Sequence, residues 1–140
     1  MHERHVTSSY WALRIAFGVV PIVAGLDKFT NLLTDWTQYL SPLATTIVPL
    51  APSTFMHVVG VIEIVVGVAI LLGFARVFGY VACAWLAAIA LNLLTTGHFF
   101  DVAARDATMA VGAFVLGQLA QVHERATAAA RVPAPTQVHA

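Results

Sequence analysis

Several ionisable side chains lie inside or beside long apolar segments, where they could do chemistry. Glu63 lies within the apolar run FMHVVGVIEIVVGVAILL, residues 55–72. Lys28 lies near the end of an earlier apolar run, and Arg105 with Asp106 precedes the last one. A carboxyl group in such surroundings can exchange protons, and a cation can stabilise negative charge on a substrate oxygen. These residue types therefore predict proton transfer or the binding of a neutral substrate such as a quinone.

Glu63 is the central candidate because of its depth in the second apolar segment. If a helix begins near residue 53, Glu63 lies about 15 Å along it, close to the middle of a hydrocarbon core about 30 Å thick. A charged side chain there costs at least about 2.5 to 3.5 kcal/mol, so we expect Glu63 to face other helices and to be protonated or paired. Two interpretations of Glu63 remain open. It could belong to a proton or substrate site, or it could be a neutral carboxyl group that forms a hydrogen bond between helices.

Further polar residues fall in the outer halves of the predicted helices, on the external side of the membrane: Asp27, Lys28, His57, Asn92, His98, Asp101, Arg105 and Asp106. His57 lies outward of Glu63, on the route that a proton would take, although an interfacial hydrogen-bonding role is equally open. Arg105 could pair with the carboxylate of Asp27, Glu63 or Asp101. We predict as catalytic residues Glu63, His57 and Arg105, and as substrate-binding residues Lys28, Asn92 and Asp106.

Patterns typical of metal, haem or nucleotide sites do not occur in the sequence. The single cysteine, Cys83, lies in an apolar run, so there is no CxxC pair and no intrachain disulfide. The spacing of His57 and His98 does not favour haem ligation by two histidines. A phosphate-binding loop and the GxGxxG, GxSxG and HExxH motifs are also missing. We expect no metal and no intrinsic cofactor, and a quinone is the one candidate molecule to be bound.

Membrane-spanning helices must position these side chains. The 140 residues are 59% hydrophobic and 10% charged, with a mean hydropathy of +0.82, which is too apolar for a soluble domain. Four stretches have the length of about 20 residues that a helical crossing needs. We predict an all-α, four-helix membrane bundle. Residues 1–10 form a short N-terminal segment and residues 123–140 a flexible tail, and the four spans lie at residues 11–29, 53–73, 77–96 and 104–122. The N-terminus lacks the features of a cleaved signal, so the first span is expected to be retained.

The loops predict how the chain lies in the membrane. Residues 30–52 should form an external loop with a short interfacial helix at residues 32–40, and the short connection at residues 73–76 makes the second and third spans an antiparallel hairpin. Only Lys28 and Arg105 fall on the external side, whereas the other basic residues share the opposite side: Arg4, Arg14, Arg76, Arg125 and Arg131. Basic loops stay in the cytoplasm. Both chain ends are therefore predicted inside, in a bacterial cytoplasmic membrane.

Small residues form stripes on the predicted helices. Gly18 and Gly25 share one face of the first span, and Gly60, Glu63 and Gly67 share a face of the second with His57. Small residues let helix backbones approach closely in a membrane. We expect a bundle interior of small residues that carries a few ionisable ones, with the large aliphatic side chains facing lipid.

The first two spans resemble the DoxX family of small bacterial membrane proteins. The resemblance rests on LRIAFGVVPIVAGLDKF, residues 13–29, and GVIEIVVGVAILLGFAR, residues 60–76. It extends over about residues 11–122, including the pair Arg105 and Asp106, and it implies a four-helix membrane fold. Carried over by position, it points to the polar residues Arg14, Lys28, Glu63 and Arg105. It also implies a quinone-linked oxidoreductase subunit, like the DoxD-like subunit of thiosulfate:quinone oxidoreductase, or a membrane anchor for redox partners.

The leading hypothesis is a subunit or partner of a membrane redox complex, with a quinone site around Glu63, His57 and Arg105. Its expected partners are the lipid bilayer and other membrane or membrane-associated subunits, and the zero net charge gives no sign of nucleic-acid binding. One alternative is a small proton-coupled transporter. Four-helix multidrug exporters, however, carry their buried glutamate in the first helix. The other alternative is a structural packing subunit without chemistry of its own.

Overall fold

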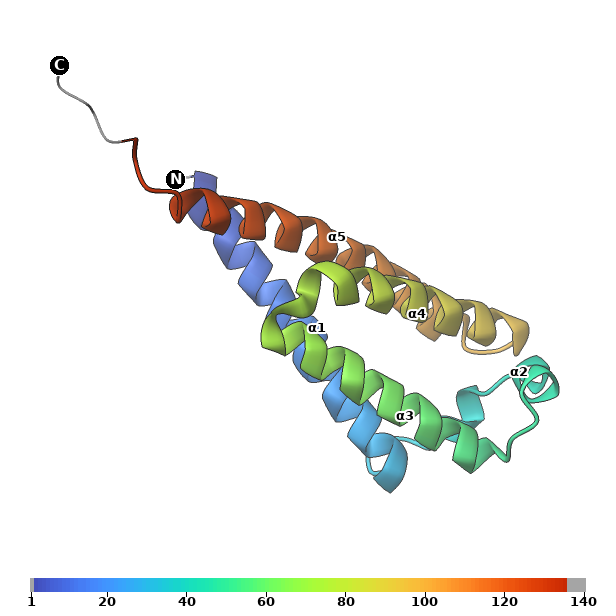
Figure 1. The fold of residues 1–140 in the computed structure, drawn as a ribbon. Helices are drawn as coiled ribbons and strands as arrows, with labels where there is room; N and C mark the ends of the chain where they lie inside the picture. The colour runs from blue at the N-terminus through green and yellow to red at the C-terminus, as the bar shows by residue number, and fades with distance from the viewer. Residues whose placement is uncertain (1, 136–140) are drawn as a thin grey trace, which may run out of the picture.

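The structure is a computed structural model that describes residues 2–135, and all regular secondary structure within that range is helical. Four long helices form two packed pairs: α1 (His2–Thr30) lies along α3 (Pro52–Ala69), and α4 (Ala75–Thr95) lies along α5 (Phe100–Ala130) (Figure 1). Contacts between α1 and α5 join the pairs. The predicted all-α class is confirmed.

A reversal at Gly73 connects the two pairs. Helix α3 continues into the π-helical turn η2 (Ile70–Phe74), in which Gly73 has φ +112°. Side chains disfavour this backbone region, and glycine enters it freely. Arg14 of α1 holds the turn by donating hydrogen bonds to the carbonyls of Ile70 (3.0 Å) and Leu71 (2.7 Å). Arg14 thus satisfies carbonyl groups that the end of a helix leaves open.

Glycines bring α1 and α3 into backbone contact. A Cβ atom on Gly25 would lie 2.5 Å from the carbonyl oxygen of Gly60, and one on Gly67 would lie 2.5 Å from that of Gly18. The predicted small-residue stripes therefore face each other at two points in an antiparallel register. That register brings the C-terminal end of α1 beside the N-terminal half of α3.

The pair α4 and α5 packs through small residues as well. Gly79 meets the backbone of Gly117, and Ala82, Ala113 and Ala120 are buried. Large apolar side chains of all four helices are exposed, among them Val23, Val61, Leu91, Val111 and Phe114. This distribution, small inside and large outside, is the one expected of helices that pack together in lipid.

Two helical stretches among the described residues are long and apolar enough to cross a membrane, His2–Thr30 and Pro52–Thr95. The second contains the reversal at Gly73, so it consists of the antiparallel helices α3 and α4 (Figure 1). Helix α5 is long enough to cross a membrane, but it is less apolar than these two stretches. Four separate crossings and the inward position of both ends therefore stay predictions.

The external loop differs from the helix predicted at residues 32–40. It contains a 3₁₀ turn, η1 (Trp36–Tyr39), and a short helix, α2 (Pro42–Ile47). The Asp35 side chain caps η1, and Ser41 caps α2, with Pro42 in the first helical position. Such capping signals divide the segment into two short elements instead of one amphipathic helix.

Helix ends also differ from the predicted bounds. Helix α1 begins at His2 and α5 continues to Ala130, so part of the predicted N-terminal segment and of the predicted flexible tail is helical. Residues 136–140 of that tail lie outside the described residues. Helix α3 begins at Pro52, a residue that suits the first helical position because no backbone N–H is needed there.

Candidate functional site

A buried ion pair joins α1 to α3. The Lys28 Nζ atom lies 2.6 Å from Glu63 Oε2, and the two side chains are only 4% and 11% exposed. The backbone contact between Gly25 and Gly60 places these residues side by side, because Lys28 lies one turn beyond Gly25 and Glu63 one turn beyond Gly60. Glu63 therefore faces other helices and is paired, which is one of the two states expected of it.

The external loop covers the ion pair through Trp36. The Trp36 ring lies against Lys28, with Nζ 3.7 Å from the ring centroid, a geometry that favours a cation–π interaction. Asp27 positions this ring by accepting a hydrogen bond from the indole Nε1 at 2.8 Å. Asp27 also accepts hydrogen bonds from the backbone N–H groups of Leu32 and Leu33. The carboxylate next to Lys28 in sequence thus holds the loop over Lys28.

Helices α4 and α5 complete the surroundings of the pair. Asp106 of α5 is 6% exposed and lies close enough to Lys28 and Glu63 for electrostatic interaction. Trp85 of α4 lies beside Glu63, with its indole N–H close enough to interact with the carboxylate, although this buried N–H makes no hydrogen bond of ordinary geometry among residues 2–135. All four long helices therefore contribute a polar side chain to this region, which we call the four-helix site: Lys28, Glu63, Trp85 and Asp106.

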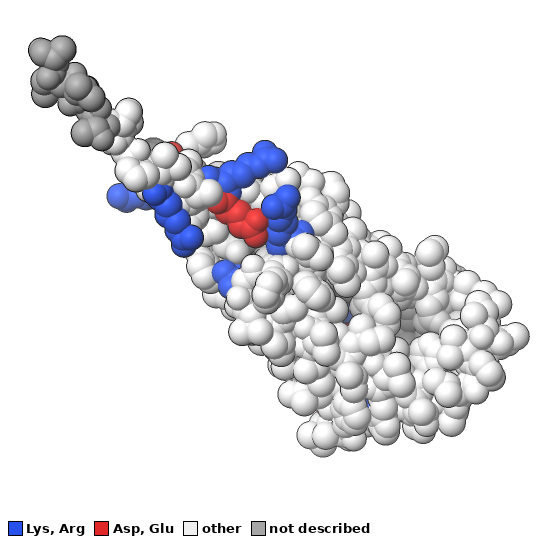
Figure 2. Space-filling model, in the orientation of Figure 1, with Lys and Arg blue, Asp and Glu red and all other residues white. Residues whose placement is uncertain are grey.

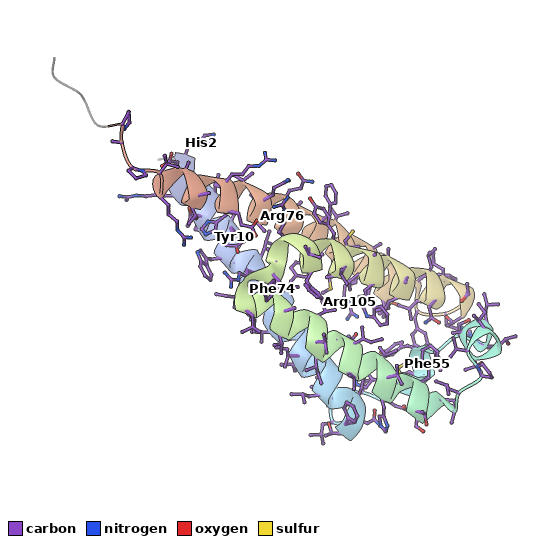
Figure 3. The ribbon with its side chains drawn as sticks, in the orientation of Figure 1. His2, Tyr10, Phe55, Phe74, Arg76 and Arg105 are labelled. Atoms are coloured by element: carbon purple, nitrogen blue, oxygen red, sulfur yellow. The ribbon has the colours of Figure 1, made fainter. Side chains whose placement is uncertain are left out.

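Arg105 pairs with its neighbour in sequence. Its Nε atom lies 3.3 Å from Asp106 Oδ1, and its side chain is 63% exposed. The prediction that Arg105 pairs with Asp27, Glu63 or Asp101 is therefore wrong. In the view of Figure 3, Arg105 lies between the ribbons of α3 and α4. It is an accessible cation next to a buried carboxylate.

Neither His57 nor Asn92 forms a hydrogen bond or ion pair with Lys28 or Glu63 among residues 2–135. His57 is exposed and stacks on Phe29, with ring centroids 4.7 Å apart. The buried face of α3 runs through Met56 and Gly60 to Glu63, so His57 lies at its edge and not within it. Proton relay through His57 stays a prediction without a direct contact to support it.

Asn92 holds the external loop. Its side-chain oxygen accepts a hydrogen bond from Ser41 N at 3.1 Å, and its nitrogen donates one to the carbonyl of Tyr39 at 2.8 Å. Both ends of the amide are therefore used within the protein. The geometry assigns Asn92 an anchoring role, and substrate binding by this residue stays a prediction.

Lys28 and Glu63 together form an acid–base pair in a low-dielectric setting. An ammonium group can donate hydrogen bonds to a substrate oxygen and stabilise its developing negative charge. A carboxyl beside it can accept or release a proton. Asp106 adds a second buried carboxylate. The described residues contain no group of three or more histidine, cysteine, aspartate or glutamate side chains that could hold a metal ion.

Comparison with known proteins identifies the family. The DoxX family model matches residues 10–104. The chain belongs to the DoxX family. Neither the curated proteins nor the solved structures give a match. The family and the two apolar helical stretches indicate that this is a membrane protein.

The DoxX match includes most of the four-helix site. Lys28, Glu63 and Trp85 fall inside the matched range, whereas Arg105 and Asp106 lie directly beyond its end. The resemblance described from the sequence extended further, to about residue 122. The contribution of α5 to the site therefore rests on the structure of this chain and not on the family match.

Sequence reasoning missed the two tryptophans of this DoxX protein that surround the ion pair. Trp36 comes nine positions after Asp27 in a loop, and nothing in the spacing indicates that the loop folds back. Trp85 lies in an apolar run, where a tryptophan is usually a packing residue. The only available signal was its polar N–H, which generally requires a partner when it is buried.

Proposed function

We propose that this DoxX protein is a membrane subunit or partner of a redox complex in a bacterial cytoplasmic membrane, and that the four-helix site exchanges protons with a quinone. The supporting observation is the buried pair of Lys28 and Glu63, 2.6 Å apart, enclosed by side chains from all four long helices. Reduction of a quinone to a quinol takes two electrons and two protons. The electrons would come from the partner subunit, and this chain would handle protons.

In this mechanism the quinone carbonyl approaches Lys28, whose ammonium group stabilises the negative oxygen as electrons arrive. The Lys28 ammonium group transfers a proton to that oxygen, and the Glu63 carboxylate takes up a proton from the aqueous side and passes it to the neutral Lys28 amine. Repeating this cycle supplies the second proton. The indole N–H of Trp85 lies beside Glu63 and stabilises its carboxylate. Arg105, exposed beside the buried Asp106, is the cation that an incoming substrate or an acidic partner surface would meet first.

The decisive experiment is extraction of the protein from its native membrane in a mild detergent, followed by identification of the bound polypeptides by mass spectrometry. We expect redox subunits in stoichiometric amounts, with quinone reductase activity in the purified complex. Glu63→Gln should leave the complex assembled and lower that activity at least tenfold. Glu3→Gln, a change at an exposed carboxylate, is the matched control. A chain recovered alone, or an unchanged rate in Glu63→Gln, would refute the proposal.

The same ion pair supports proton-coupled transport as the second candidate, because ionisable residues inside a membrane protein commonly mark ion pathways. This candidate predicts that the protein purifies as copies of itself and moves protons with a substrate in proteoliposomes. Glu63→Gln should then abolish transport without affecting insertion. If the protein purifies with partners but Glu63→Gln changes no activity, the chain is a packing subunit.

A further inference from the structure

A polar depression lies at the end of the molecule where α1 begins and α5 ends. It has a volume of about 290 Å³ and is formed where α1 and α5 extend past the reversal at Gly73: its lining residues are Tyr10, Arg14, Gly73, His123, Glu124, Thr127, Ala128 and Arg131. Figure 2 shows basic side chains gathered at this end around a small acidic patch, whereas most of the remaining visible surface is uncharged. Figure 3 places Tyr10 and Arg76 there.

Positive charge dominates the depression. Arg14 donates hydrogen bonds to two backbone carbonyls and to the Tyr10 hydroxyl, at 3.3 Å, none of which neutralises its charge. Glu124 is the acidic lining residue, and it already pairs with Arg76, at 3.4 Å. Within residues 2–135, neither Arg14 nor Arg131 has a carboxylate partner. An anion could therefore bind here without displacing an existing ion pair.

The depression lies at the level of the lipid headgroups. The reversal at Gly73 ends the apolar helices α3 and α4, so the hydrocarbon core ends near it. Trp11 is 43% exposed next to the lining residue Tyr10, and tryptophan prefers the membrane interface. Tyr10 stacks on His123 of α5, with centroids 4.4 Å apart. This stacking joins the two helices that form the walls of the depression.

We propose that this depression binds the phosphodiester headgroup of an anionic phospholipid. The guanidinium groups of Arg14 and Arg131 match phosphate oxygens in geometry and charge. The Thr127 hydroxyl in the same wall donates its hydrogen bond to the backbone carbonyl of His123, at 2.9 Å, so the two arginines are the donors that would hold the phosphate. The acyl chains would lie along the exposed apolar side chains that begin below the headgroup level. This proposal does not depend on the four-helix site.

The experiment measures phospholipid retained by the full-length protein after purification in detergent that contains equal amounts of phosphatidylglycerol and phosphatidylcholine. We expect the wild type to retain phosphatidylglycerol selectively. Arg131→Gln should reduce that retention about fivefold, because one arginine is lost at a charged interface. Arg125→Gln, on the same helix but outside the lining, is the matched control and should retain as much as the wild type.

Three outcomes would overturn the proposal. Equal losses in Arg131→Gln and Arg125→Gln would show attraction by overall surface charge, and lack of selectivity in the wild type would show that no such site exists. A third arm adds inorganic phosphate to lipid-free protein and follows the unfolding midpoint. Stabilisation by inorganic phosphate but not by phosphatidylglycerol would mean that the depression takes a soluble phosphate compound and not a lipid.

Discussion

Lys28 and Glu63 show how far a single residue can be interpreted from sequence. An isolated acid in the middle of an apolar run must be neutral or paired, so Glu63 could be identified without a structure. Its partner could not be identified, because Lys28 lies 35 positions away and the pairing depends on the register of two helices. His57 illustrates the opposite error: its spacing of three from Gly60 suggested the buried face, but it lies at the edge of that face.

A double-mutant cycle tests the pair. Lys28→Met leaves Glu63 buried without a counter-charge, and breaking a buried pair in this way costs about 3 to 5 kcal/mol. Replacement of both residues by methionine removes both charges and should recover most of that loss. We therefore expect the double variant to have a higher unfolding midpoint in detergent than Lys28→Met alone. A double variant less stable than both single variants would show that the ion pair is itself a major source of stability.

Asp27 provides a second test at this scale. Asp27→Ala removes the acceptor that holds Leu32, Leu33 and Trp36, so the loop should separate from the ion pair. We expect faster backbone hydrogen exchange across residues 31–40, measured by mass spectrometry. Asp35→Ala is the control, because Asp35 bonds only to Thr37 within the loop and should change exchange locally. Identical exchange patterns in the two variants would contradict the assigned role of Asp27.

At the scale of the elements, glycine spacing was the most informative sequence feature. The repeat of two glycines seven positions apart in each of two segments predicted close helix approach, and α1 and α3 meet at those glycines. The external loop was less predictable. Its helix was expected at residues 32–40, but Ser41 and Pro42 begin the helix later, and Asp27 draws residues 32 and 33 out of helical geometry. The secondary structure of this loop therefore depends on side chains outside residues 32–40.

Gly60→Ala tests the glycine contact. Its Cβ would lie 2.7 Å from the backbone carbonyl of Gly25, so α1 and α3 must move apart, at a cost of about 1 to 3 kcal/mol. Because the same contact aligns Lys28 with Glu63, the variant should also lose activity. Gly112→Ala is the control, since its new methyl group meets only the far end of the Phe17 ring. Equal unfolding midpoints for the two variants would argue against a backbone contact.

The whole molecule contains three distinct environments. Large apolar side chains cover the outside, the four-helix site lies within, and the basic depression lies at the end where α1 begins and α5 ends. Composition alone predicted the apolar exterior and the membrane setting. The arrangement of helices in two pairs was not predicted. It depends on which small-residue faces pack against each other, and several helices carry faces of similar composition, so the sequence does not indicate the partners.

The number of crossings depends on α5. Its composition is less apolar than that of α1, α3 and α4, but its buried Asp106 and its close contact with α4 at Gly117 argue that it crosses beside them. In a Cys83→Ala background, Ser8→Cys and Thr127→Cys should react with an impermeant maleimide only from the cytoplasm, and Thr45→Cys only from outside. Labelling of Thr127→Cys from the same side as Thr45→Cys would mean that α5 does not cross. The basic depression between α1 and α5 would then lose one wall, so this result would also remove the basis for the lipid site.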